Sequence, residues 1–194
     1  MLGMKGFYFL VFVLLGVANG FAAENPVSVK SGDVSVFKEK AVMNVVFAFE
    51  NATVGDSVSI DEYYAAKEDE DLESFKTSFD NANVVLAERF NKKKGKKIGI
   101  TMSAGKSSDA KYVMVFNVYN MELGFAGGNF MPFSDGKTGG MELTGILRIK
   151  DKSTGNVVCE LNVDKVTGVS SYTFNQRAQM VCWELAKQLI KAVK

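Results

Sequence analysis

Ala41-Val-Met-Asn-Val-Val-Phe-Ala-Phe49 is a short run that is almost wholly apolar and rich in β-branched and aromatic side chains. Such a run is typical of a central strand covered on both faces. Residues 98–102 form a second, shorter candidate strand. Because a helical segment separates the two, a right-handed crossover should make them parallel neighbours.

Two long helices are predicted, over residues 71–94 and 173–193, because apolar residues recur at intervals of three and four. Acidic residues precede the first helix and lysines end it, which suits the helix dipole. Thr173 with Gln176, and Ser59 with Glu62, have the spacing of capping boxes, the second at the start of a short helix. The expected buried positions are Leu72, Phe75, Phe79, Ala82, Leu86 and Phe90 in the first long helix and Phe174, Ala178, Val181, Cys182, Leu185, Leu189 and Val193 in the last.

Three further strands are predicted at residues 111–125, 141–150 and 157–164, since apolar and polar residues alternate along them. Strict alternation indicates one buried and one wet face. Residues 151–156 have the composition of a hairpin connection. Residues 27–37 alternate loosely, and with a turn at 38–40 they could pair with the 41–49 run as a hairpin.

These elements predict an α+β fold: a two-layer sandwich with a mixed, mostly antiparallel sheet of about five to six strands and both long helices on one face. Residues 1–22 are expected to be a signal peptide and residues 23–194 a single α+β domain.

The N-terminal segment has the pattern of a secretory signal peptide. Lys5 precedes an unbroken apolar run over residues 7–15, and small residues follow it. The run is short for a bilayer span, which needs about 20 apolar residues. No cysteine lies near the cleavage region, so a lipoprotein is not expected, and no later segment is apolar enough to cross a membrane. The expected location is the periplasm or the medium.

Composition excludes several function classes. The chain has no histidine, so histidine-based triads and the commonest metal ligand are absent. Without residues 1–22 the chain carries 22 basic and 22 acidic residues, which argues against binding to nucleic acid. We expect no catalytic set, no metal and no cofactor. The oligomeric state is left open.

Cys159 and Cys182 both fall on predicted buried faces. An oxidising compartment favours a disulfide between them. A bridge needs Cα atoms within about 7 Å, whereas packed layers lie about 10 Å apart. Two buried thiols are therefore the preferred interpretation, with the disulfide as the alternative.

Residues 124–140 are the most informative segment for function. They join two predicted antiparallel strands with far more residues than a hairpin needs. Six glycines indicate flexibility, yet the segment also holds Phe125, Phe130, Met131 and Phe133. These four residues are the candidate interaction site. Either they contact a partner, an apolar ligand or a membrane surface, or they fold back over the domain's own sheet edge.

Other motifs are better explained by structure than by function. Gly105-Lys106-Ser107 lacks the first glycine of a phosphate loop in register. The lysines within residues 92–97 and the acidic run 68–71 suit the two ends of a helix. Glu50 has the position of a strand-end residue that reaches water. The glycosylation patterns Asn51-Ala52-Thr53 and Asp56-Ser57-Val58 are short and common by chance.

The element order, the Lys-Ser-Thr-Gly-Asn-Val-Val turn at 152–158 and the amphipathic closing helix resemble a broad group of exported Gram-negative envelope proteins. Their domain looks like the N-terminal domain of TolB and the periplasmic core of CsgG. The resemblance covers roughly residues 41–193 and implies fold and compartment. It implies no site residues, because the lipidated cysteine and pore strands of CsgG and the propeller of TolB have no counterpart here.

Two functions follow as hypotheses. The first is a non-enzymatic exported cell-envelope protein that binds a protein partner or ligand through residues 124–140. The alternative is a small secreted hydrolase or carbohydrate-binding module that uses carboxylates. A cleft with converging carboxylates, at least one of them desolvated, would favour the alternative.

The N-terminal pattern yields a direct test. The mature protein should begin between Phe21 and Glu24 and be recovered from the periplasm or the medium, because the apolar run directs export. Intact-mass measurement of each cell fraction checks this. Full-length chain in the cytosol would contradict it.

Overall fold

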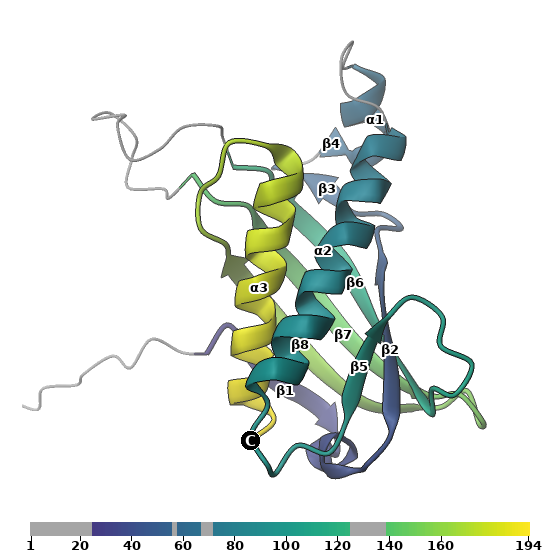
Figure 1. Ribbon diagram of the computed structural model, residues 1–194. Helices are drawn as coiled ribbons and strands as arrows, with labels where there is room; N and C mark the ends of the chain where they lie inside the picture. The colour runs from purple at the N-terminus through teal and green to yellow at the C-terminus, as the bar shows by residue number, and fades with distance from the viewer. Residues whose placement is uncertain (1–24, 56–57, 67–71, 125–138) are drawn as a thin grey trace, which may run out of the picture.

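The computed structural model describes residues 25–55, 58–66, 72–124 and 139–194. Within them, a mixed sheet carries helices on one face (Figure 1). The strands are β1 (Val27–Gly32), β2 (Val42–Ala48), β3 (Thr53–Val54), β4 (Val58–Ser59), β5 (Thr101–Ala104), β6 (Tyr112–Glu122), β7 (Glu142–Asp151) and β8 (Val157–Thr167). The helices are the 3-10 helix η1 (Val34–Lys38) and the α-helices α1 (Ile60–Ala65), α2 (Leu72–Lys93) and α3 (Phe174–Ala192).

The main path of the sheet runs β1-β8-β7-β6-β2-β5. β2 is parallel to β5, which confirms the expected parallel pairing of these two segments, and it is also parallel to β6, which was not predicted. The pairs β6–β7, β7–β8 and β1–β8 are antiparallel. The short strands β3 and β4 bring the sheet to eight strands, more than the predicted five to six. Two-residue strands carry too little periodicity to be detected in a sequence.

The predicted hairpin between residues 27–37 and 41–49 is wrong. β1 pairs with β8 at the other edge of the sheet, with Val27 opposite Val163. Residues 34–38 form the 3-10 helix η1 instead. The Asp33 carboxylate caps its N-terminus by accepting hydrogen bonds from the backbone N–H and the hydroxyl of Ser35. This cap turns the chain away from β1 before β2 begins.

The predicted long helices agree with α2 and α3 to within a residue at each end, and both lie side by side against the same face of the sheet (Figure 1). Both capping boxes are present, with Ser59 and Glu62 at α1 and Thr173 and Gln176 at α3. Of the residues expected on the buried stripes, only Leu72 and Phe174 are partly exposed.

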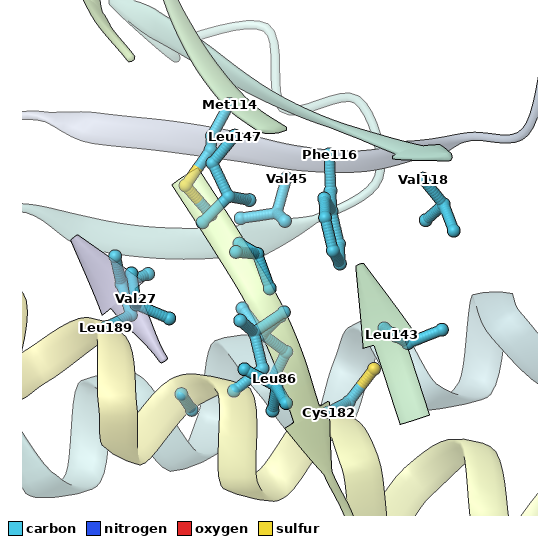
Figure 2. Close-up of a cluster of buried hydrophobic side chains, with 14 of the residues drawn as sticks. Val27, Val45, Leu86, Met114, Phe116, Val118, Leu143, Leu147, Cys182 and Leu189 are labelled. Atoms are coloured by element: carbon cyan, nitrogen blue, oxygen red, sulfur yellow. The ribbon is translucent and has the colours of Figure 1, made fainter. Parts of the chain in front are cut away.

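The core lies between the helical layer and the sheet (Figure 2). Strand residues such as Val45, Met114 and Phe116 contribute from one side, and Leu86 of α2 and Leu189 of α3 from the other. Cys159 and Cys182 are free and buried in the structure, as the preferred interpretation predicted. Burial raises the pKa of Cys159 to about 11 and that of Cys182 further, so both thiols stay protonated near neutral pH.

The alternation along residues 157–164 places Val157 on the same face as Cys159, Leu161 and Val163, yet Val157 is 47% exposed. The β7–β8 register shifts between Ile149 and Lys150, so that Cys159 is opposite Ile149 while Val157 is opposite Lys150. The irregularity moves Val157 to the outer face, because one extra residue reverses the side of every residue beyond it.

Leu185 tests the placement of α3. Its side chain is fully buried, so Leu185→Ala should lower the free energy of unfolding by about 2–5 kcal/mol. Lys191→Ala, an exposed position on the same helix, should change it by less than about 0.5 kcal/mol. Urea denaturation measures both. A Leu185 effect as small as that of Lys191 would mean that α3 packs through another face.

Candidate functional site: the loop end and the β2 groove

The interaction residues predicted from the sequence, Phe125, Phe130, Met131 and Phe133, lie outside the described residues. The chain on either side of them is described, from Leu123 to Gly124 and again from Gly139 onward. We define the loop end as residues 123–124, 139–141 and 168–173, where β6 ends, β7 begins and β8 passes to α3.

Glycines bring the backbones of the loop end into direct contact. A Cβ added to Gly124, which has a φ of +65°, would lie 2.5 Å from the carbonyl oxygen of Gly139. A Cβ on Gly140 would lie 1.8 Å from the carbonyl oxygen of Gly168, and one on Gly168 would lie 2.5 Å from the backbone nitrogen of Val181 in α3. These glycines therefore serve close packing, where the sequence indicated flexibility.

Arg177 also connects the segments of the loop end. It projects from the first turns of α3 and is almost wholly buried. Its Nε donates to the carbonyl oxygen of Leu123 at 2.9 Å, and its Nη1 donates to the carbonyl oxygens of Ser171 at 3.3 Å and Tyr172 at 3.1 Å. The planar guanidinium thus holds the end of β6 to the β8–α3 connection.

Two apolar side chains project from this fixed backbone into solvent. Val169 is 66% exposed and Tyr172 is 76% exposed, the highest values among the large hydrophobic residues that the structure describes. Their backbone is held by Gly168 on one side and by the Thr173–Gln176 capping box on the other. A side chain displayed from an ordered backbone loses little conformational entropy on binding, so this arrangement is preorganised for contact.

A groove of about 950 Å³ lies at the carboxyl end of β2, alongside the N-terminal half of α2. Phe47, Phe49 and Phe79 contribute apolar surface, and Asn83 also lines the groove. Charged residues of both signs complete the lining: Glu50, Asp61, Lys76, Asp80 and Lys106.

The groove brings together two candidates that the sequence analysis set aside, Glu50 and Lys106. The carboxylates of Glu50, Asp61 and Asp80 are all on exposed residues. A hydrolase cleft would need at least one desolvated carboxylate, so the lining does not meet that criterion. Among the described residues, no group of three or more histidine, cysteine or acidic side chains could hold a metal ion.

Of the lysine cluster at residues 92–97, one member has a structural role. Lys94, predicted as part of a solvated cluster, is half-buried, and its ammonium donates to the carbonyl oxygens of Gly99 and Ile100 and to Thr101 Oγ1. Burial lowers the pKa of Lys94. The other lysines of that cluster are exposed. The acidic run and residues 56–57 lie outside the described part of the chain.

Sequence reasoning missed Asn83, Arg177, Val169 and Tyr172. An arginine and an asparagine inside helices read as ordinary surface residues, and no local signal reveals their distant carbonyl partners. The glycine at 168 was the available clue, since glycine at the end of a strand often marks close backbone approach.

No family model and no curated protein matches this sequence. Among solved structures, the PelC dodecamer from Paraburkholderia phytofirmans aligns with 17% identity and a TM-score of 0.39, over 84% of this chain and 95% of that chain. A point variant of the same dodecamer aligns with 16% identity and a TM-score of 0.38, over 84% of this chain and 96% of that chain. Similarity of this degree assigns no function to the chain. Within the described residues, no helix is both long and apolar enough to traverse a membrane.

The Arg177 contacts can be tested directly. Arg177→Met should lower the free energy of unfolding by about 1–3 kcal/mol, because three carbonyl oxygens lose their donor. Arg177→Lys should recover only part of this, since an ammonium cannot replace the guanidinium fork. Denaturation with both variants measures it.

Arg148→Met is the matched control, because Arg148 pairs with Glu160 at 2.7 Å on the face of the sheet without helices. Its loss should be smaller than that at Arg177, because Arg148 is one-third exposed and Glu160 keeps Lys30 as a second partner. Equal losses at the two arginines would contradict the role given to Arg177.

Proposed function

We propose that the chain is an exported, non-enzymatic protein of the bacterial cell envelope that binds a protein partner through its loop end. The N-terminal signal pattern and the resemblance to TolB and CsgG domains support export to the envelope. The two-layer α+β arrangement, with both long helices on one face of the sheet, is consistent with that resemblance. Partner binding would occur on the surface where residues 124–140 leave and rejoin the sheet.

A single observation carries the proposal. Val169 and Tyr172 are exposed on an ordered backbone that Arg177 joins to the start of the phenylalanine-containing loop. Tyrosine is enriched among the residues that dominate binding energy at interfaces. Full burial of a valine side chain contributes about 1.5–3 kcal/mol. The loop phenylalanines would extend the same apolar surface.

Binding is favoured over hydrolysis because the groove carboxylates are exposed and lie among lysines. A perturbed carboxylate in a dry cleft is what glycoside hydrolysis would require. The loop end has the opposite character, since it offers apolar side chains and no charged cluster. It is suited to contact and not to proton transfer.

The loop variants test the proposal. Phe130→Ser combined with Phe133→Ser should abolish capture of the partner from envelope extracts while the melting temperature stays nearly unchanged, because exposed apolar groups stabilise only the complex. Tyr172→Ser should weaken the same capture. Affinity capture followed by mass spectrometry, with calorimetry of each variant, measures both quantities.

Val157→Ser is the control, because Val157 is exposed at the opposite end of β8. It should leave capture unchanged. A large drop in melting temperature in the double variant would show instead that the phenylalanines pack on the domain itself. Capture that survives the double variant would also refute the proposal.

A further inference from the structure

The edge of β2 is open where β5 stops. Pairing of β2 with β5 ends at Val45–Ala104, whereas pairing with β6 continues to Ala48–Asn117. Residues 46–48 therefore have a strand on one side only among the described residues. An unpaired strand edge presents backbone donors and acceptors that another strand can use.

The direction of these groups follows from the ladder. Thr101 of β5 donates its N–H to the carbonyl of Ala41, and Lys111, just before β6, donates to the carbonyl of Val42. Odd-numbered residues of this strand therefore face β5 and even-numbered ones face β6, because N–H and C=O of one residue point to the same side of a strand. The N–H and C=O of Phe47 face the open side, and the groove lies there.

Asn83 of α2 occupies the point where the β5 ladder ends. Its Nδ2 donates to the carbonyl oxygen of Val45 at 2.7 Å, where the next residue of a longer β5 would have donated. Because a carbonyl can only accept, this bond fixes the orientation of the amide. Its Oδ1 has no partner within the described structure, although the residue is only 6% exposed. Such a buried acceptor normally has a donor.

The rest of the groove suits apolar side chains next to this edge. Phe47 and Phe49 are partly buried, and their rings pack on Phe79 with centroids 5.4 and 4.7 Å apart. Val84 of α2, 44% exposed, adds an apolar wall. Charges of both signs in the lining favour neither an anion nor a cation. The volume falls within the range of about 300–1,000 Å³ of ligand sites.

We propose that this groove binds an extended peptide segment of a partner protein, which adds to the edge of β2 as a continuation of β5. Backbone groups of the segment would pair with Phe47, and one of its N–H groups would donate to Asn83 Oδ1. Apolar side chains at alternate positions would lie against Phe47, Phe49 and Val84. A small apolar ligand could cover the rings, but it would leave the strand edge and the asparagine unpaired. This site is separate from the loop end and does not depend on it.

The probe is a peptide selected from a display library of random linear peptides on the full mature protein. Its binding should slow hydrogen exchange of the Phe47 amide at least tenfold, because that N–H becomes bonded. The same peptide with N-methyl groups at alternate residues should bind at least tenfold more weakly, since it keeps the side chains and loses backbone donors. Isothermal titration and amide exchange by NMR measure these effects.

Val84→Lys and Val157→Lys are matched variants, because the two valines are 44% and 47% exposed. The lysine at 84 lies four residues from both Asp80 and Glu88, so α2 should remain stable. Val84→Lys should weaken the peptide at least tenfold and Val157→Lys should not. The Phe130→Ser, Phe133→Ser variant should bind it normally, which separates this test from that of the loop end.

Three results would overturn the proposal. One is a selection that yields no peptide sensitive to Val84→Lys. Another is equal binding of the N-methylated and parent peptides, which would indicate a site for apolar side chains or small apolar ligands alone. The third is a bound peptide that leaves Phe47 exchange unchanged.

Discussion

Strand β2 connects the two sides of the sheet, because β5 pairs with one of its edges over residues 42–45 and β6 pairs with the other over residues 43–48. Its core-facing residues Met43 and Val45 are completely buried under the helices. On the other face, Asn44 donates from Nδ2 to the carbonyl of Ser107 and accepts from the Ser107 N–H at 3.0 Å. The side-chain amide thereby holds the β5–β6 connection against β2, much as a neighbouring strand would. Without these bonds a buried asparagine would destabilise the centre of the sheet.

The same arrangement explains why a groove exists. The chain leaves β5 at Ala104 to cross β2 and enter β6, so residues 46–48 of β2 have no strand on that side within the described parts of the chain. Asn83 donates to the carbonyl oxygen of Val45, which β5 no longer reaches. The rings of Phe47, Phe49 and Phe79 pack together and cover the core at this end of β2. Because β5 and β6 lie on opposite sides of β2 and are both parallel to it, the chain must cross β2 between them. This crossing leaves the edge of β2 beside the phenylalanine rings of the groove without a strand among the described residues. Parallel sheets commonly place binding sites beyond their carboxyl ends for related reasons.

At the loop end, glycine contacts and one arginine hold the backbone in place. Its segments approach so closely that only glycine fits at Gly124, Gly140 and Gly168, and Arg177 supplies donors to carbonyl groups that no strand pairs. The result is a rigid base that displays Val169 and Tyr172. The groove and the loop end use separate parts of the sheet, so substitutions at one should leave the other intact.

Local patterns in the sequence were sufficient for the helices, their capping boxes and most strands. Buried residues recur at the helical interval, as at Phe75, Phe79 and Leu86, or at every second position, as at Met114 and Phe116. These intervals can be read directly from the sequence. The helix predicted between residues 41–49 and 98–102 was sufficient to predict the parallel pairing of β2 with β5. The signal peptide at the N-terminus stays a prediction. The helices, their capping boxes and the strands depend on residues close together in the chain.

Which strands pair, and which distant groups the buried polar side chains bind, depended on the tertiary structure. β1 pairs with β8 and not with β2, and Asn83 finds Val45 and Arg177 finds Leu123 across the layers. The energy of such contacts depends on which distant backbone groups the finished packing leaves unpaired, and nothing near these residues in the chain records that. Gly168 shows the limit most clearly: the sequence contains the glycine, but only the approach of α3 explains why no side chain fits there.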